Sequence, residues 1–189
     1  MGVFNALNTR FSFHPSAILW LSVLGYLHPR IVFPFVLSVL LHELGHYLCL
    51  LSMGLPPRHV TFTLAGAKME IPPLGYRQEF LCAASGPAMS LLLGLFLPLW
   101  PMLGGYSLCL GAVNLLPLGN LDGGRMLRCV LLMCLPQGPA LKLFRTVNVV
   151  VGCLLMLPGL YFCVYGHMGL LPLLICGALL YKALRAGVL

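Results

Sequence analysis

The chain has 189 residues, of which 60% are hydrophobic and 8% are charged, and its mean hydropathy is +0.97. A soluble domain of this length needs a polar shell that this composition cannot supply, so lipid must cover most of its surface. The net charge of +7 comes from basic residues scattered along the chain, which argues against a nucleic-acid partner. We expect a single membrane-embedded domain over residues 1–189.

Six apolar stretches are predicted to be transmembrane helices. They cover about residues 14–27, 31–53, 77–99, 103–117, 141–159 and 163–181. With a cytoplasmic N-terminus, every basic residue except Arg30 falls in a cytoplasmic segment or at the cytoplasmic end of a span, which is a strong positive-inside bias. The predicted fold class is therefore an all-α polytopic membrane protein with both termini in the cytoplasm. No cleavable signal is expected, because no small-residue cleavage site follows the first apolar stretch.

The second stretch contains His42-Glu43-Leu44-Gly45-His46 near its middle. On a helix, His42 and His46 share one face, so both imidazoles can bind one metal ion. Glu43 lies beside them and can take a proton from a metal-bound water and pass it to a leaving amine. A carboxylate at membrane depth is costly and marks a functional site by default. The pattern predicts a catalytic zinc centre in which Glu43 is the general base.

A different pattern lies between the second and third stretches. Apolar residues alternate with threonines over 60–64, and they alternate with Lys68 and Glu70 over 67–71. A period of two with a turn between the halves predicts a small β-hairpin. An open sheet edge cannot face lipid, so the hairpin must lie at the cytoplasmic interface or against the helices. It either only joins two spans or receives an extended substrate strand along its edge.

The third stretch carries Gly86, Ser90 and Gly94 at intervals of four residues. This small-residue face predicts close packing against another helix. The eight cysteines of the chain form no Cys-x-x-Cys pair. They indicate small, reduced packing residues rather than a thiolate zinc site or a disulfide framework.

A catalytic zinc needs a third protein ligand and an open position, and the other acidic residues are Glu70, Glu79 and Asp122. Glu70 lies in the predicted hairpin, and Glu79 fits the cap of a helix. Asp122 follows a helix break at Pro117 and is flanked by glycines. Irregular backbone at membrane depth is tolerated where it lines a cavity or is buried in protein. We therefore predict Asp122 as the third ligand.

Asn114 ends the fourth stretch, three residues before Pro117. Its amide either satisfies backbone groups freed by the helix break, or it donates to the substrate backbone or to the developing oxyanion. The sequence leaves both alternatives open.

The motifs together resemble those of a known family. In chain order they are His42-Glu43-Leu44-Gly45-His46, Ser85-Gly86-Pro87, Asn114-Leu115-Leu116-Pro117 and Leu121-Asp122-Gly123-Gly124. This set resembles the site-2 proteases, the intramembrane zinc metalloproteases of the M50 peptidase family. The resemblance implies a zinc metalloendopeptidase with one Zn²⁺ bound by His42, His46 and Asp122, and with Glu43 as the catalytic carboxylate. It also implies a membrane-tethered protein substrate that is cut within or near the cytoplasmic leaflet.

Within that family, the chain is most similar to the stage IV sporulation protein FB group. The shared features are His14-Pro15 before the first stretch, the hairpin from Arg58 to Ile71 and the compact six-span layout. This resemblance implies a bacterial cell membrane, that of the mother cell around a forespore, a pro-sigma factor as substrate and inhibitory membrane-protein partners. The chain departs from the group in two ways. We expect no CBS domain, and no PDZ domain either, and Gly119-Asn120 replaces an expected proline-containing stretch.

The alternative function is that of a non-enzymatic membrane protein, either a zinc-binding chaperone or a metal carrier. Such a protein would use the same buried ligands but has no evident use for Glu43. A carrier would also need further inward-facing ligands along a path, and the remaining spans offer almost none.

Overall fold

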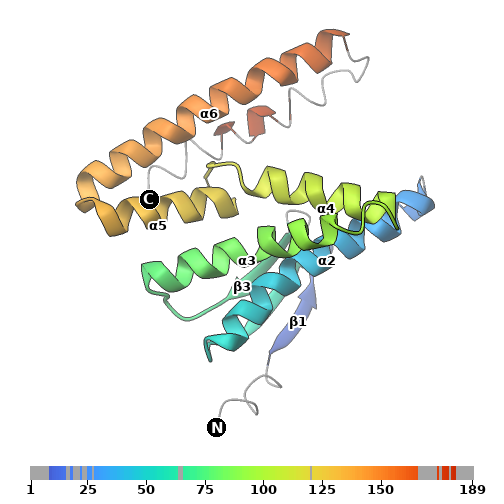
Figure 1. The fold of residues 1–189 in the computed structure, drawn as a ribbon, viewed down its shortest axis with the longest axis horizontal. Helices are drawn as coiled ribbons and strands as arrows, with labels where there is room; N and C mark the ends of the chain where they lie inside the picture. Colours follow the sequence, from blue (N-terminus) through green and yellow to red (C-terminus); the bar gives the residue numbers. More distant parts are fainter. Residues whose placement is uncertain are drawn as a thin grey trace. The chain divides into compact units, whose positions relative to one another are not determined.

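The computed structural model describes residues 9–15, 18, 22, 25–26, 28–63, 66–119, 121–165, 174, 176–178 and 180–181. The chain divides into two compact units, one that ends at Val113 and one that begins at Asn114. Figure 1 shows the helices and strands. The predicted spans 14–27 and 163–181 lie for the most part outside the described residues. The prediction of one domain stays a prediction.

The first unit contains a three-stranded sheet with the order β1-β2-β3. The strands are β1 (Arg10–Phe13), β2 (His59–Thr63) and β3 (Gly66–Glu70). The antiparallel pairing of β2 with β3 confirms the predicted hairpin, whose residues 64–65 lie outside the description. Strand β1, which pairs with β2 in parallel, was not predicted. Four residues are too few for alternation to be told from chance, and their partner strand lies far along the chain.

The strand register gives the sheet one polar and one apolar face. Arg10 is opposite His59, and Ser12 is opposite Thr61. The Oγ atom of Ser12 lies 2.8 Å from Nε2 of His59, which ties the two strands together on the polar face. Val60 lies on the other face and is 2% exposed. The sheet is therefore suited to a boundary between water and packed helices.

The first unit also contains the helices α2 (Pro29–Ser52), α3 (Tyr76–Gly94) and all but the last residue of α4 (Pro101–Asn114). They correspond to the predicted stretches 31–53, 77–99 and 103–117. Helices α2 and α3 pack side by side (Figure 1). Helix α3 ends earlier than predicted, and turns follow it. The cause is Pro98, whose ring would clash with the carbonyl of Gly94, four residues before it.

Glycines allow α4 to pack closely on α3 and on the turn after it. A Cβ atom on Gly104 would lie 2.6 Å from the Cα of Leu97, and one on Gly111 would lie 3.0 Å from the Cβ of Ser90. Gly105 has room, since the nearest atom to its Cβ position is 3.9 Å away. Neighbouring glycines on one helix therefore differ sharply in how much space they have.

The second unit contains α5 (Asp122–Cys134) and α6 (Gln137–Tyr165), which pack against each other. Helix α6 contains the predicted span 141–159 and extends beyond it at both ends. Helix α5 was not predicted, because the glycines after Asp122 suggested irregular backbone. The bend lies before Asp122 instead, and α5 is too short to cross a membrane.

Within the part of the chain that is described, two helical stretches are long and apolar enough to cross a membrane. They are Arg30–Ser52, with 23 residues, and Gln137–Tyr165, with 29. At about 1.5 Å per residue, the shorter stretch spans roughly 34 Å, slightly more than the hydrocarbon core of a bilayer. The count of six spans stays a prediction.

We predict that Gly104→Ala lowers the free energy of unfolding by about 1–3 kcal/mol, because the added methyl group meets the backbone of Leu97. Gly105→Ala is the matched control on the next residue and is expected to be neutral or slightly stabilising, since alanine favours helix. Thermal unfolding of both purified variants in one detergent measures the difference. Equal stability of the two variants would contradict the close packing of α4.

Candidate metal centre

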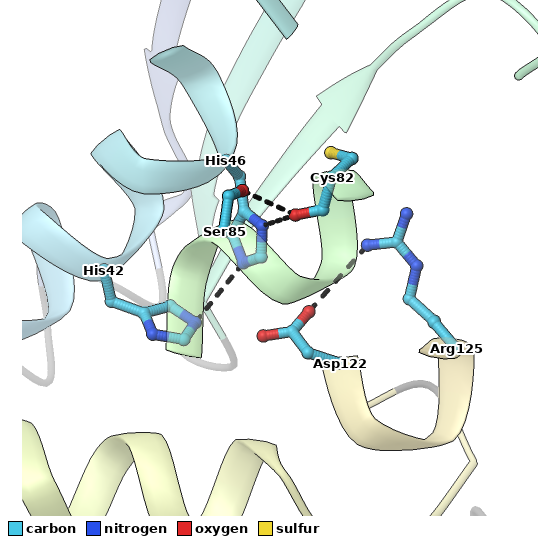
Figure 2. Close-up of polar contacts among 6 residues, drawn as sticks. All are labelled: His42, His46, Cys82, Ser85, Asp122 and Arg125. Atoms are coloured by element: carbon cyan, nitrogen blue, oxygen red, sulfur yellow. Dashed lines mark hydrogen bonds and ion pairs between the residues drawn. The ribbon is translucent and has the colours of Figure 1, made fainter. Parts of the chain in front are cut away.

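His42 and His46 lie one turn apart on the buried face of α2. Pro29 occupies the first turn of this helix, where its fixed φ favours helix formation and its missing N–H is harmless. Positions four residues apart then share one face. The two side chains are 3% and 7% exposed, and their Nε2 atoms are 3.3 Å apart (Figure 2). The structure thus confirms that both rings project together.

Helix α3 holds each imidazole at its Nδ1 atom. His46 Nδ1 lies 2.7 Å from the carbonyl oxygen of Cys82, and His42 Nδ1 lies 2.8 Å from Oγ of Ser90. A carbonyl can only accept, so Nδ1 of His46 carries the proton and Nε2 presents a lone pair. The Ser90 hydroxyl can accept in the same way and give His42 the same tautomer. Such partners orient metal-binding histidines and raise their basicity.

The distance between the two Nε2 atoms fits a shared zinc ion. Two nitrogens that each lie about 2.0–2.1 Å from a tetrahedral zinc are about 3.3–3.4 Å apart. The observed separation is 3.3 Å. Two imidazole lone pairs at this separation repel each other unless a cation lies beside them. The donor set and its spacing therefore match two ligands of one metal ion.

Two glycines make this arrangement possible. A Cβ atom on Gly86 would lie 2.8 Å from Nε2 of His42 and would overlap Nε2 of His46. Gly45 lies between the histidines, and a Cβ there would lie 2.6 Å from the carbonyl oxygen of Ser85. Gly45 thus lets α2 and α3 approach, and Gly86 leaves space beside the ring nitrogens. The small-residue face predicted for α3 serves the candidate metal site as well as helix packing.

Glu43 follows His42 directly on α2 and is half-buried. Adjacent helical residues point about 100° apart, so the carboxylate projects beside the face that carries the two imidazoles. This position agrees with the predicted role of a base next to a metal-bound water.

Asp122 is the first residue of α5 and is 7% exposed. Its Oδ1 atom lies 3.9 Å from a guanidinium nitrogen of Arg125, one turn further along α5 (Figure 2). The positive end of the helix dipole and this guanidinium both stabilise a negative charge on the carboxylate. A negative charge on this buried carboxylate is therefore compensated within α5 itself.

The loop before Asp122 is shaped by glycines. Gly119 has a φ of 47°, a left-handed conformation that favours glycine. A Cβ on Gly124 would lie 2.6 Å from the Gly119 carbonyl oxygen, and one on Gly123 would overlap the carbonyl of Leu115. Helix α5 thus begins directly against the loop. The glycine that departs from the expected family pattern supplies the conformation that the loop requires.

The remaining candidates lie elsewhere. Glu70 is exposed at the end of β3, opposite His59. Glu79 is half-buried in the first turn of α3, where a capping role was predicted. Asn114 is the last residue of α4 and is half-buried.

The sequence did not reveal the polar contacts of two buried residues, Ser90 and Asn148. Ser90 had been interpreted as a packing residue, and its spacing from Gly86 gave no sign of a contact with His42. Asn148, in α6, is followed by an apolar stretch and is 0% exposed, but no spacing in the sequence identifies its partner.

We predict that Gly86→Ala lowers zinc affinity by at least about 10-fold, because its methyl group occupies the space beside both Nε2 atoms. Gly105→Ala, on α4, is expected to keep the wild-type affinity. Competition with a chelator, followed on both purified variants, measures this. Wild-type zinc affinity in Gly86→Ala would show that the space beside the histidines holds no ion.

Part of the chain is similar to a known peptidase family. Residues 96–158 match the model of Peptidase family M50. The protein "Putative zinc metalloprotease sll0528" of Synechocystis sp. is 34% identical over 124 residues, which cover 57% of this chain and 32% of that protein. This chain therefore spans about a third of the length of that relative.

A solved structure has a similar fold. The site-2 protease from Methanocaldococcus jannaschii superposes with a TM-score of 0.67 at 21% identity, over 96% of this chain and 92% of that chain. The chain thus has the same fold as that site-2 protease, and its residues 96–158 are similar to Peptidase family M50.

Proposed function

We propose that this chain is an intramembrane zinc metalloprotease that hydrolyses a peptide bond of a membrane-associated protein within or near the cytoplasmic leaflet. The observation that carries this proposal is the pair of buried imidazoles, whose Nε2 atoms are 3.3 Å apart. Glu43 is next to them in the sequence, and the M50 match supports a peptidase. The length and composition of α2 and α6 support a membrane location.

The proposed third ligand is Asp122. Its support is its burial, the positive helix end on which it lies and the frequent pairing of a carboxylate with two histidines in catalytic zinc sites. Glu70 is exposed, and Glu79 lies in the first turn of α3, so each has an ordinary structural role. The ligand set proposed for one Zn²⁺ is therefore His42, His46 and Asp122.

In the proposed mechanism, Glu43 accepts a proton from the attacking water and later donates it to the leaving amine. Bound zinc would lower the pKa of that water and polarise the scissile carbonyl. The Cys82 carbonyl holds His46 in the tautomer that presents Nε2, and the Ser90 hydroxyl can accept from Nδ1 of His42 to the same effect. Asn114 is proposed to donate a hydrogen bond to the substrate backbone or to the oxyanion that forms during attack.

The sheet supports a proposal for substrate binding. Strand β2 is paired on both sides, by β1 and by β3, so it has no edge to offer. Strand β3 is an outer strand of the described sheet and contacts α2, the helix that carries the histidines. An extended substrate can add along β3 through backbone hydrogen bonds. We propose β3 as the strand that receives it.

The finer features of the function rest on the sequence resemblance. They are the six crossings with cytoplasmic termini, the mother-cell membrane, the pro-sigma factor substrate and the inhibitory membrane-protein partners. The chaperone or carrier alternative would leave Glu43 without a role, so a variant at this residue separates it from the protease.

We predict that Glu43→Gln abolishes cleavage and retains stoichiometric zinc, because it removes the base without removing a ligand. The assay is cleavage of a co-expressed pro-sigma factor or another membrane-tethered reporter, with the metal content of the purified variant measured in parallel. Full activity in Glu43→Gln would contradict the mechanism.

We also predict that Asp122→Ala loses bound zinc, whereas Glu70→Ala and Glu79→Ala keep it. Metal analysis of the three purified variants identifies the carboxylate ligand. If zinc is instead lost from one of the two glutamate variants, the assignment of Asp122 fails while the histidine pair stands.

A further inference from the structure

A single buried amide ties α6 to the loop that precedes α5. Asn148 is 0% exposed, and its Oδ1 atom accepts a hydrogen bond from the backbone N–H of Gly119. Its Nδ2 atom donates to the carbonyl of Phe144, 2.7 Å away on the same helix. A buried amide is costly unless its hydrogen bonds are made. One of its two hydrogen bonds reaches a loop 29 residues away, so the amide fixes tertiary structure as well as its own helix.

Gly119, whose N–H is bound by Asn148, lies close to Asp122 in the chain. Gly119 precedes Asp122 by three residues, and the N–H of Leu121 donates to the carbonyl of Leu118 across the same turn. On the other side of Asp122, the Cα of Gly124 packs against this turn, with no room for a Cβ. The backbone on both sides of Asp122 therefore rests on the segment that Asn148 anchors. A shift of Gly119 would be passed on to the start of α5.

We propose that Asn148 is a positioning residue for Asp122. By holding Gly119, it fixes the start of α5 and keeps the Asp122 carboxylate in the geometry that binds zinc. This inference rests on the proposed function, because it requires Asp122 to be a ligand. An apolar side chain at position 148 could fill the same volume, but it would leave the buried N–H of Gly119 without its acceptor.

The first test compares two variants on the same helix. Asn148→Leu keeps the size of the side chain and removes both hydrogen bonds. Thr146→Val is the matched control, since Thr146 donates to the Lys142 carbonyl at 3.1 Å but does not hold the loop. Asn148→Leu is expected to weaken zinc affinity by about 10–100-fold, whereas Thr146→Val leaves it unchanged. Chelator competition on the full chain in detergent measures both, and unchanged affinity in Asn148→Leu overturns the inference.

The second test is a double-mutant cycle with Asp122→Ala. If Asn148 acts through Asp122, Asn148→Leu causes no further loss of the residual zinc affinity that the two histidines retain in the Asp122→Ala background, measured by titration with added zinc. An equal fold-loss in both backgrounds means a general effect on the fold and overturns the inference.

The cycle also distinguishes failure of the Asn148 role from failure of the Asp122 ligand assignment. Loss of zinc in Asp122→Ala, with wild-type affinity in Asn148→Leu, overturns the role of Asn148 alone. Wild-type affinity in Asp122→Ala overturns the ligand assignment and the inference together.

Discussion

A polar group buried among apolar helices must find its partner inside the protein, and this constraint organises the described structure around the candidate site. The two imidazoles of α2 meet it through α3, at the hydroxyl of Ser90 and the carbonyl of Cys82. Because Nδ1 of each ring is engaged there, the two Nε2 atoms face each other. In the second unit, the amide of Asn148 meets the same constraint through the loop before α5. The hydrogen bonds that satisfy these buried polar groups thus also fix the positions of the candidate site residues.

Glycine has different roles at different positions of the fold. At Gly104 and Gly45 it lets backbones approach, since an added Cβ would meet main-chain atoms. At Gly86 the missing side chain leaves a space bounded by imidazole nitrogens. At Gly119 the requirement is conformational, because the backbone is left-handed there. Sequence spacing can indicate the first role, but it cannot separate the other two from it.

Much of the fold and the main motif of the site could be predicted from the sequence. The apolar stretches near α2, α3, α4 and α6 and the alternation in the hairpin are strong local patterns. The convergence of His42 and His46 follows from helix geometry. Features that depend on distant parts of the chain were missed: the parallel pairing of β1, the contact of Ser90 with His42 and the anchoring role of Asn148. Helix α5 was missed for a local reason, because its initial glycines disfavour helix and only the packing against the loop explains them.

The parallel pairing of β1 with β2 restricts how the first unit can thread a bilayer. Two strands joined by backbone hydrogen bonds must lie on the same side of the membrane. The chain between Phe13 and His59 must therefore cross the bilayer an even number of times. If α2 crosses the bilayer once, the chain between β1 and β2 must cross it at least once more to keep the number of crossings even. In a membrane-embedded chain, such a hydrogen-bonded pair of strands limits the topology independently of hydropathy or of the distribution of basic residues.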